Sequence, residues 1–388
     1  MSKKSNAFFE NGSWYHRTRT INDDYSVAYS KKGGFKTKEE AEKSLKEYEL
    51  KYMKDYNGMR NNINDSITIK NYLTFWFENI FKDKIQSTTE MIASYTIYNL
   101  IIPNIKEDVS LKILTSEYIN ELIGKIKVLY SNASAKKTRE IFNISLKYAY
   151  NNKIINYNPM INVEFVKNER KTIEILKKEE IKILLKEASK SNWYLEILLA
   201  LFCGLRKGEI LGLKFSDFNF KEGTVTIKRQ LITSYDIENN EKKKMKIREY
   251  NIVERDPKTI NSFRKLKVPD SIMQQVKGRK KLVEYYKMKN EEYNDNDYIS
   301  CQSNGKPHGL SSLNSYIKKI CKKLGLPEIT VHGLRHMYAT ILMEQGVDLV
   351  KISAILGHES IHTTFEYYCD VMEDDIKIQK FLNINFNN

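Results

Sequence analysis

Hydrophobic and polar positions follow two different periods along the chain, a β-type period near the N-terminus and a helical period afterwards. Residues 13–19 and 25–30 are rich in aromatic and β-branched side chains and flank the turn-forming Asn22-Asp23-Asp24, which predicts a small β-ribbon. Lys31-Lys32-Gly33-Gly34 indicates a second turn, after which Phe35 opens a short third strand.

A helix is predicted directly after this ribbon. Thr37 and Glu40 have the spacing of a capping box, in which the hydroxyl accepts the N–H of Glu40 and the carboxylate reaches back. We expect the helix to run to about residue 53 and the polar residues 55–65 to form a linker. Ribbon and helix together are expected to form a domain over residues 1–60.

From residue 66 the apolar residues recur at helical spacing, with Tyr72, Trp76 and Ile80 on one face. Further helices are expected over residues 89–101, 116–129 and 134–150, the last of them capped by Ser134. This pattern predicts a helical domain over residues 66–165. Three basic residues of its last helix are candidate contacts to phosphates, namely Lys136, Lys137 and Arg139.

A third domain is predicted over residues 172–388, where helical and strand patterns mix. Helices are expected over residues 177–188, 193–202 and onward from 311; strands are expected over 224–227 and 263–268, with a loop or an extended hairpin over 236–248. The predicted fold is therefore multi-domain and mainly α: a small β-ribbon plus helix, a helical domain, and a mixed α+β C-terminal domain.

Composition narrows the function. The 388 residues carry a formal net charge of +15, which favours a polyanionic partner, nucleic acid before anionic membrane. The chain has no apolar run of about 18 residues, and its N-terminus lacks the apolar core of a signal peptide, so we expect neither membrane spanning nor secretion. The four cysteines lie far apart without a C-x-x-C pair, which predicts reduced thiols and no finger-type zinc site.

Three short segments carry candidate chemistry. In Gly204-Leu205-Arg206-Lys207-Gly208-Glu209 the arginine would sit near a helix start that favours anions, or else at the surface paired with Glu209. His332 and Arg335 share one helical face at i, i+3. His358 and His362 have the i, i+4 spacing of zinc ligands, although ordinary helix histidines without a metal are the expected reading. Each segment alone is a weak signal.

Together and in this order, the segments resemble the tyrosine recombinase (phage integrase) family. They read G-L-R-x-x-E-x-x-x-L, then H-x-L-R-H, then L-G-H with a tyrosine about ten residues later. The helical region looks like the core-binding domain of this family, and the N-terminal ribbon looks like the arm-binding module of integrases from phages and integrative conjugative elements. The resemblance implies a catalytic domain of the tyrosine recombinase type. It also implies a site-specific recombinase that cuts and rejoins DNA through a 3′-phosphotyrosyl intermediate to integrate and excise a mobile element.

The resemblance also implies roles for single residues. Arg206 and Arg335 match the arginines that neutralise the phosphate, and His332 and His358 match the histidines that assist proton transfer or bind the phosphate. Asp256-Pro257-Lys258-Thr259 looks like the P-K-T element of the family, which makes Lys258 the expected general acid. Lys265 and Lys267 are alternatives, and simple contact with the DNA backbone is another reading. Two arginines would hold the phosphate, so no metal and no other cofactor is implied.

The nucleophile is one of two adjacent tyrosines. Tyr368-Cys369-Asp370-Val371 resembles the family's Y-x-H-V, with Asp370 in place of the histidine, whereas Tyr367 would put Val371 out of register. We therefore expect Tyr368 to attack the phosphate, with Tyr367 as the alternative.

The expected partner is double-stranded DNA, at a core site and at an arm site. The ribbon offers basic and aromatic residues for a DNA groove, or else a solvated basic face: Trp14, Arg17, Arg19, Lys31 and Lys32. By resemblance we further expect a homo-tetramer on paired sites, an excisionase or a host DNA-bending protein as helper, and a place on the nucleoid in the bacterial cytoplasm. A type IB topoisomerase and a DNA-binding regulator without catalysis are the competing hypotheses.

Overall fold

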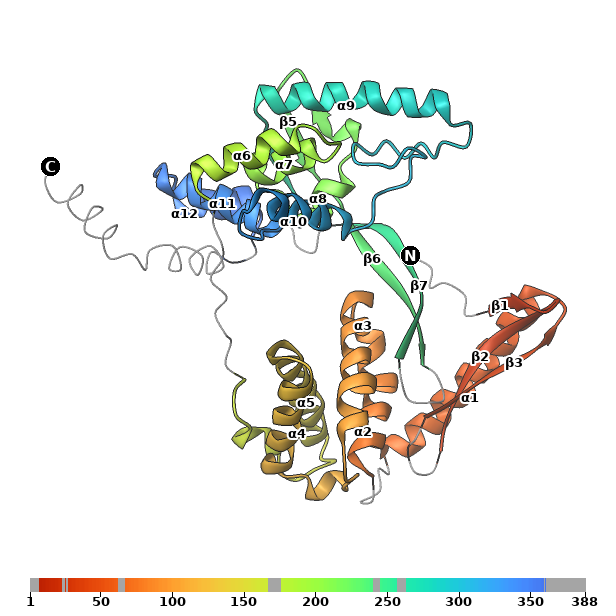
Figure 1. Ribbon diagram of the computed structural model, residues 1–388. Coiled ribbons are helices and arrows are strands. Elements are labelled where there is room, and N and C mark those ends of the chain that lie inside the picture. Colours follow the sequence, from red (N-terminus) through yellow and green to blue (C-terminus); the bar gives the residue numbers. More distant parts are fainter. Residues whose placement is uncertain are drawn as a thin grey trace, which may run out of the picture. The chain divides into compact units, whose positions relative to one another are not determined.

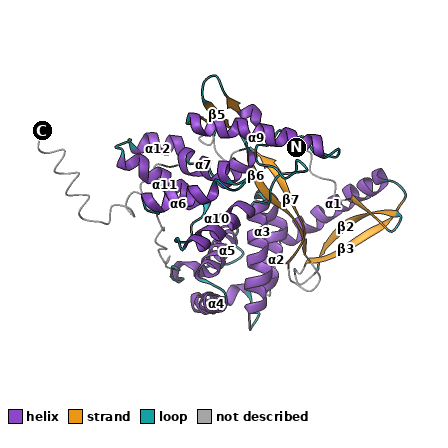
Figure 2. Ribbon diagram, turned by 45° about the horizontal axis from the view of Figure 1, so that its top comes forward, coloured by secondary structure: helices purple, strands orange, loops and turns teal. Residues whose placement is uncertain are grey.

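The structure, a computed structural model, describes residues 7–22, 25, 27–61, 67–166, 176–239, 245–256, 263–358 and 360. The chain divides into two compact units, Met1–Arg170 with Tyr235–Tyr250, and Lys171–Ser234 with Asn251–Asn388. Figures 1 and 2 show that helices dominate and that the sheets are small. The predicted fold class, mainly α with a small N-terminal sheet, is confirmed. The boundaries predicted for three domains stay predictions.

The first unit begins with a three-stranded antiparallel sheet in the order β1 (Ala7–Glu10), β2 (Ser13–Ile21), β3 (Val27–Phe35). The strand beyond the two predicted ones is therefore β1, which precedes both of them in the chain. The prediction that a strand opens at Phe35 is wrong, because Phe35 is the last residue of β3. Asn11 and Gly12, with φ of 47° and 78°, form the tight turn that joins β1 to β2, as Asn-Gly does in hairpins. The turn predicted at Lys31 to Gly34 is also wrong, because these residues belong to β3. Gly33 lies there under the ring of Tyr15, where an added Cβ would stand 1.8 Å from Cδ1.

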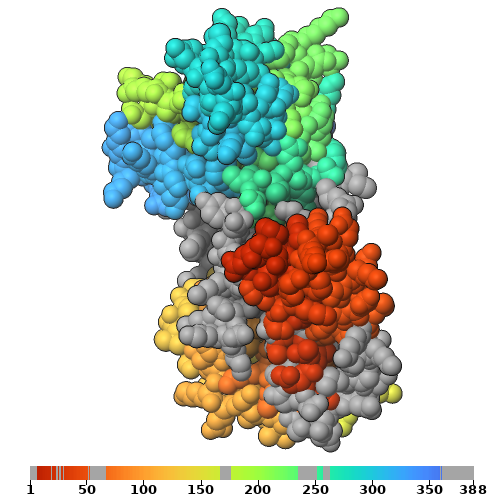
Figure 3. All heavy atoms as spheres, turned by 90° about the vertical axis from the view of Figure 1, so that its right-hand side faces the viewer, coloured from red at the N-terminus to blue at the C-terminus, as the bar shows by residue number. Residues whose placement is uncertain are grey.

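Helix α1 (Lys38–Asn61) covers one face of this sheet. The buried His16 of β2 has its Nε2 3.0 Å from the Ser44 hydroxyl of α1. The predicted cap is present, because the Glu40 N–H donates to the Thr37 hydroxyl at 3.2 Å. The linker predicted over 55–65 is wrong for residues 55–61, which continue α1. Figure 3 shows the sheet and α1, in red and orange, forming one continuous surface.

The N-terminal part packs on the helical part of the same unit. Tyr25, in the connection between β2 and β3, is 5% exposed, and its ring meets Phe75 edge-on with 5.9 Å between centroids. Tyr52 of α1 is also buried and donates its hydroxyl hydrogen to Asn79 Oδ1. Tyr25 thus belongs to the hydrophobic core of the helical part.

The helical part is built around large buried side chains. Trp76, Tyr72 and Phe142 are among its fully buried residues, and the Tyr72 hydroxyl donates to the Ser145 carbonyl at 2.6 Å. Its elements are α2 (Ile69–Trp76), the π-helix η1 (Phe77–Phe81), η2 (Lys82–Lys84), α3 (Ser87–Tyr95), the π-helix η3 (Thr96–Ile101), η4 (Ile102–Asn104), η5 (Leu111–Ile113), α4 (Ser116–Leu129), α5 (Asn132–Asn151) and η6 (Pro159–Asn162).

The start of α5 corrects one prediction. Ser134 was expected to cap this helix, but the helix begins two residues earlier, and Ser134 is inside its first turn. Its backbone N–H is one of the unpaired donors that a helix start leaves. Ser131 supplies the cap, since its hydroxyl accepts that N–H at 3.1 Å.

The second unit surrounds one largely apolar helix, which carries the buried Glu196, with small sheets and further helices. Strands β4, β5 and β8 form one sheet in that order, and β6 and β7 form a hairpin, so the hairpin alternative for 236–248 is confirmed in its described part. The elements are α6 (Lys178–Ala188), α7 (Tyr194–Cys203), α8 (Lys207–Gly212), η7 (Phe215–Asp217), β4 (Phe218–Asn219), β5 (Thr224–Ile227), β6 (Gln230–Asn239), β7 (Met245–Arg255), β8 (Arg264–Lys267), α9 (Asp270–Lys289), α10 (Ser312–Leu324), α11 (Val331–Glu344) and α12 (Leu349–Leu356). Of the hairpin β6–β7, residues 235–250 are grouped with the first unit.

Helix α7 is the centre of this unit and packs against α11. It ends at Gly204, whose φ of 61° is left-handed and costs glycine little. An added Cβ there would lie 2.5 Å from Tyr338 Cδ1 of α11 and 2.7 Å from Leu356 Cδ2 of α12. The backbone after α7 therefore lies directly against both helices, which carry the second and third sequence motifs.

Candidate functional site

The three motifs meet in the second unit, at the starts of two helices and the end of a third. Arg206 is the N-cap residue of α8, His332 and Arg335 lie in the first two turns of α11, and His358 follows the left-handed Gly357 that ends α12. The structure therefore brings together four of the six catalytic residues predicted from sequence. The other two, Lys258 and Tyr368, lie outside the described residues, as does Tyr367.

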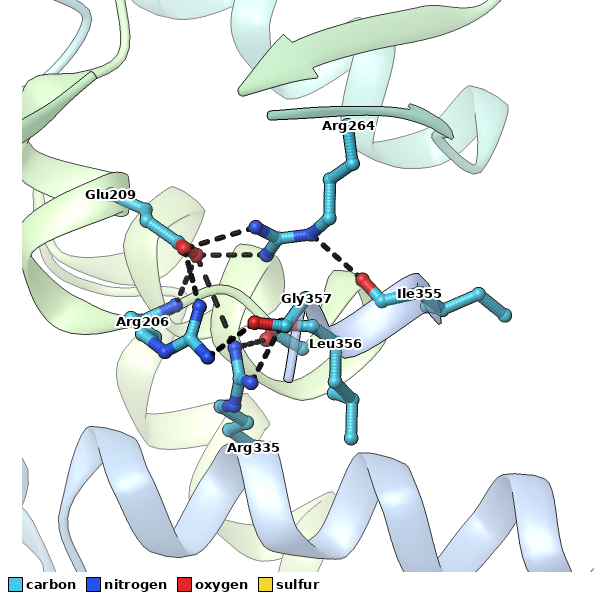
Figure 4. Close-up of polar contacts among 8 residues, drawn as sticks. Arg206, Glu209, Arg264, Arg335, Ile355, Leu356 and Gly357 are labelled. Carbon is cyan, nitrogen blue, oxygen red and sulfur yellow. Dashed lines mark hydrogen bonds and ion pairs between the residues drawn. The ribbon is translucent and has the colours of Figure 1, made fainter. Parts of the chain in front are cut away.

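Glu209 is the centre of this site (Figure 4). Its side chain is 3% exposed and accepts from Arg206 at 2.9 Å. Arg264 of β8 approaches the same carboxylate in fork geometry, with Nη1 3.0 Å from Oε1 and Nη2 2.8 Å from Oε2. The Arg335 guanidinium stands 4.0 Å from Oε2. One buried carboxylate is thus shared by three arginines, and it holds their charges close together.

The end of α12 supplies the remaining acceptors. Three consecutive backbone carbonyls accept from three different arginines, as the dashed lines of Figure 4 show: Ile355 from Arg264 Nε at 2.7 Å, Leu356 from Arg335 Nη2 at 2.7 Å, and Gly357 from Arg206 Nη2 at 2.7 Å. The last carbonyls of a helix are unpaired within it and carry the negative end of its dipole, so cations stabilise them. Arg335 Nη1 also donates to the Gly204 carbonyl, at 2.8 Å.

The site carries a surplus of positive charge. Three guanidiniums stay protonated in proteins, and they face one carboxylate. Burial raises the pKa of Glu209, but the hydrogen bond and charge of Arg264, with the charge of Arg206, outweigh it and hold that pKa below its ordinary value. Glu209 is therefore ionised, and two positive charges remain uncompensated by it. A partly buried site of this charge is suited to bind a phosphate.

The histidines beside the arginines are held neutral. Burial, followed by the charges of Arg335, Arg206 and Arg264, lowers the pKa of His358 to about 4. Partial burial of the ring and the charge of Arg335 lower the pKa of His332 as well. Neutral imidazoles have one nitrogen that accepts a proton and one N–H that donates. Either histidine therefore has the protonation state that a base for a tyrosine hydroxyl needs.

Strand β8 separates the sequence candidates for the general acid. Side chains alternate across a strand, and Arg264 points to Glu209 while Lys265 and Lys267 lie on the other face. There Lys265 pairs with Glu222, and Lys267 donates to the Glu222 carbonyl at 3.0 Å. Neither lysine points toward the arginines, so Lys258, six positions before Arg264 in the sequence, stays the predicted general acid.

The candidate DNA contacts of the ribbon lie on both faces of the sheet. Arg17 and Lys31 are direct cross-strand partners and lie over aromatic rings, Arg17 over Phe8 at 5.7 Å and Lys31 over Tyr15 at 5.1 Å. Arg19 lies on β2 opposite Tyr29, and Trp14 contacts Phe9. Lys32 is the partner of His16, whose ring faces α1.

The candidates of α5 differ from one another in their partners. Arg139 donates to the Glu164 carbonyl at 2.9 Å and to the Val163 carbonyl at 3.3 Å, and its guanidinium stacks over Phe165 at 4.1 Å. It therefore fixes the chain after η6. Lys137 pairs with Glu140 at 2.7 Å, and Lys136 is exposed. Contact with DNA remains a prediction for each of these candidates.

Two further features concern what surrounds the site. Within the described ranges, no three His, Cys, Asp or Glu side chains come together as a metal site would require. None of the helices described there combines the length and the apolarity needed to cross a membrane.

Sequence reasoning missed three residues of the site. Glu209 was part of the first motif but was weighed only as a surface partner of Arg206. Arg264 carried no motif signal, and nothing in the sequence said that it would reach a residue 55 positions away. His336 has its ring edge-on to His332, with 4.1 Å between centroids, and burial lowers its pKa to about 3. The second histidine of the H-x-L-R-H motif was the sequence signal that could have pointed to His336.

The chain resembles known proteins in family, in sequence and in fold. The model of the phage integrase family matches residues 174–374. The protein named "Tyrosine recombinase XerC-like" of Caldanaerobacter subterraneus subsp. tengcongensis is 30% identical over 394 residues, which cover 96% of this chain and 96% of that protein. The Tn1549 transposon integrase in complex with transposon right end DNA superposes with a TM-score of 0.64 at 17% identity, over 78% of this chain and 94% of the other. A lambda integrase tetramer bound to a Holliday junction gives a TM-score of 0.57 at 18% identity, over 93% and 97%.

Proposed function

Because the chain belongs to the phage integrase family of tyrosine recombinases, we propose that it recombines specific DNA sites through a 3′-phosphotyrosyl intermediate and so integrates and excises a mobile element. The observation that carries this proposal is the cluster of Arg206, Arg264 and Arg335 around Glu209, with His332 and His358 beside it. Such a cluster matches the charge of a phosphodiester and is aligned before the substrate arrives.

The arginines supply the main stabilisation of the transition state. A phosphodiester carries one negative charge, and attack on phosphorus adds a second in the pentavalent state. The surplus of two positive charges at the site matches this state better than the ground state, which is the condition for catalysis. Arg206 is the most accessible of the three guanidiniums, with 35% of its side chain exposed, and is the first to meet the phosphate.

The proton steps follow from the histidines and Lys258. The Tyr368 oxygen bonds to phosphorus while its proton passes to a neutral imidazole, of His332 or His358. The bond from phosphorus to the 5′-oxygen breaks, and that oxygen takes a proton from Lys258. Rejoining runs the same steps backwards with a 5′-hydroxyl of another strand, so the energy of the broken bond is kept in the phosphotyrosine.

The partners we propose follow from this chemistry and from the relatives. Double-stranded DNA is bound at a core site and, through the β1–β3 sheet, at an arm site. A tetramer on paired sites is supported by the lambda integrase tetramer on a Holliday junction. An excisionase or a host DNA-bending protein would set the direction, and the bacterial nucleoid is the place of action. The mobile-element role is supported by the transposon integrase among the structural neighbours.

The test is to trap the covalent adduct on a nicked core-site substrate, whose cleaved end diffuses away and prevents rejoining. We expect the full chain to form an adduct that Tyr368→Phe abolishes while DNA binding is retained. Tyr367→Phe is the matched control and should leave the adduct intact. If Tyr367→Phe removes it instead, the nucleophile is Tyr367. If no variant-dependent adduct forms at all, the chain lacks the proposed reaction.

The same preparation separates the competing functions. A recombinase requires paired specific sites, whereas a type IB topoisomerase relaxes any supercoiled plasmid. A DNA-binding regulator binds the core site but forms no adduct. Relaxation of a plasmid that lacks the core site, at a rate equal to that of a plasmid that carries it, would contradict site-specific recombination.

A further inference from the structure

In the chemistry above Arg264 contributes only its charge, yet its side chain makes three hydrogen bonds within the site. Its side chain is 6% exposed. Both Nη atoms pair with the two oxygens of Glu209, and its Nε donates to the Ile355 carbonyl at 2.7 Å. A planar guanidinium that binds a carboxylate with two parallel hydrogen bonds is the strongest and most directional ion pair that side chains form.

We propose, on the basis of the proposed function, that Arg264 is a positioning residue for DNA cleavage, which holds Glu209 so that Arg206 can exchange it for the scissile phosphate. Arg206 shares this carboxylate with Arg264, since its Nη1 donates to Oε1 at 2.9 Å and its backbone N–H donates to Oε2 at 2.8 Å. The hydrogen bond from the Arg206 backbone N–H to Glu209 can stay in place when the guanidinium turns to a phosphate. The hydrogen bond from the Arg206 guanidinium to Glu209 has to break.

The cost of that change depends on Arg264. A buried carboxylate that loses its partner strongly destabilises a protein, because an uncompensated charge is left in the interior. With Arg264 in place, Glu209 keeps a paired cation when Arg206 moves, so this penalty is avoided. Without Arg264, Arg206 would be the main partner of Glu209, and the carboxylate would compete with the phosphate for it. Arg264 therefore acts on the reaction through Glu209 and Arg206 and not through the DNA.

The third contact of Arg264 joins the start of β8 to the end of α12. The Ile355 carbonyl belongs to the last turn of α12, two residues before Gly357, whose carbonyl accepts from Arg206. Arg264 is also the first residue of β8, six positions after Lys258 in the sequence. Arg264 thus fixes the start of β8 against the end of α12, which carries His358.

The experiment measures single-turnover formation of the covalent adduct by the full chain on the nicked core-site substrate. We expect Arg264→Gln to slow this step by about 100-fold, the loss that misplacing a catalytic group causes, with little change in DNA affinity. Arg264→Lys keeps the charge but not the fork, and should fall between wild type and Arg264→Gln. A rate for Arg264→Gln within about threefold of wild type would overturn the proposal.

A second substitution distinguishes positioning from simple loss of structure. Glu209→Gln, added to Arg264→Gln, replaces the competing carboxylate by a neutral amide and releases Arg206. The double variant should therefore cleave about tenfold faster than Arg264→Gln alone, a coupling typical of residues in one charge network. A double variant that is equally slow or slower would also overturn the proposal.

The chain offers a matched control. Arg279 of α9 makes a comparable buried fork with Glu196 of α7, at 2.8 and 3.2 Å, without touching the residues around Glu209. Arg279→Gln should lower thermal stability but leave the cleavage rate of folded protein unchanged, and Glu196→Gln should give no rescue. If wild type itself forms no adduct, the proposed function fails. If wild type forms the adduct and Arg264→Gln does so at the same rate, only the role of Arg264 fails.

Discussion

At the scale of single residues, the site depends on charges placed where they alter one another's protonation. His358 follows the end of α12, at which three arginines converge, and both burial and these charges oppose a further positive charge. An isolated histidine is largely neutral at pH 7 and becomes charged near pH 6.5. In this site it stays neutral at much lower pH, so it remains able to accept the proton of a tyrosine.

This protonation state predicts an unusual pH profile. The pKa of His358 is about 4 in the free protein, below the ordinary 6.5. A base of lowered pKa is active above that pKa and is lost as the pH falls through it. The acid limb of kcat/KM, which reports the free enzyme, should therefore lie below pH 5. In the DNA-bound enzyme the negative charge of the phosphate offsets the charges of the arginines and raises the pKa of His358. The acid limb of kcat should therefore lie at a higher pH than that of kcat/KM.

The measurement is adduct formation from pH 4 to pH 8, with circular dichroism at each pH to confirm that the protein is folded. His358→Gln is expected to slow cleavage, because the amide has no basic nitrogen, and to leave the acid limb to His332. An acid limb of kcat/KM at pH 6.5 in wild type would contradict this prediction. The base would then not be His332 or His358 with a lowered pKa.

At the scale of elements, the site depends on where helices begin and end. Arg206 is the N-cap residue of α8, His332 is the second residue of α11, and His358 follows the glycine that ends α12. Gly204 allows this approach, since any side chain there would meet Tyr338 and Leu356 at less than 3 Å. Helix ends present unpaired N–H groups and carbonyls, so these positions supply polar partners in an otherwise apolar core.

The sequence predicted these elements well where the signal was local. The helix over 116–129 and the strand over 224–227 were predicted with their observed limits, because periodicity and flanking turns set them. The strand Ala7–Glu10 and the helix Asp270–Lys289 were missed. The first is short and polar at its end, and the second has only four buried residues in 20, so neither shows a clear period.

The same reasoning explains which parts of the site the sequence revealed. Arg206, His332, Arg335 and His358 lie in motifs and were predicted. Arg264 was not, because its importance comes from tertiary contacts to Glu209 and Ile355 that no local pattern records. On β8 the sequence drew attention to Lys265 and Lys267 as alternatives for the general acid. Of the basic residues of this strand, it is Arg264 that faces the site.

The connection between β2 and β3 gives an element-scale prediction. Tyr25 has a φ of 64°, which is strained for a side-chain-bearing residue, and it is held there by burial against Phe75. Tyr25→Ala should destabilise this docking by about 3 kcal/mol, the low end for deleting a buried aromatic ring. Hydrogen–deuterium exchange of the β3 and α2 amides should accelerate accordingly.

Tyr25→Phe is the control, because it keeps the ring and should leave exchange close to that of wild type. The substitution should act only on the first unit, so α7 and α11 amides serve as an internal reference. Equal exchange in Tyr25→Ala and wild type would mean that the N-terminal sheet does not depend on this residue for its attachment to the helical part.

At the scale of the whole molecule, the net charge of +15 is divided between two tasks. A surplus of two charges lies at the arginine cluster, where we propose that it acts on one phosphate. Much of the remaining charge lies on exposed lysines and arginines, where it would act on the DNA backbone over a larger area, which sets position and affinity and not chemistry. These two groups should therefore respond differently to salt and to substitution.

The arm-site proposal is tested best without deleting residues 1–60, because Tyr25 and Tyr52 contribute to the packing of the helical part. Arg17 and Lys31 are adjacent on the sheet, and Arg17→Ala with Lys31→Ala removes both of their charges. We expect the double variant to lose affinity for distal sites and to lower the slope of log K against log salt by about 2, one for each phosphate contact. Core-site cleavage should persist at its wild-type rate.

Lys182→Ala with Lys190→Ala is the matched control, since it removes two exposed charges from α6 and the turn that follows it, in the other unit. General electrostatic attraction depends on net charge, which both double variants lower equally, so an equal loss of distal-site affinity in both would mean that the sheet holds no special DNA contact. A loss confined to the Arg17 and Lys31 variant requires that the sheet itself meets the phosphates. If core cleavage fell along with distal binding, the division of labour between sheet and arginine cluster would be refuted, because the two charges would then serve one common DNA site.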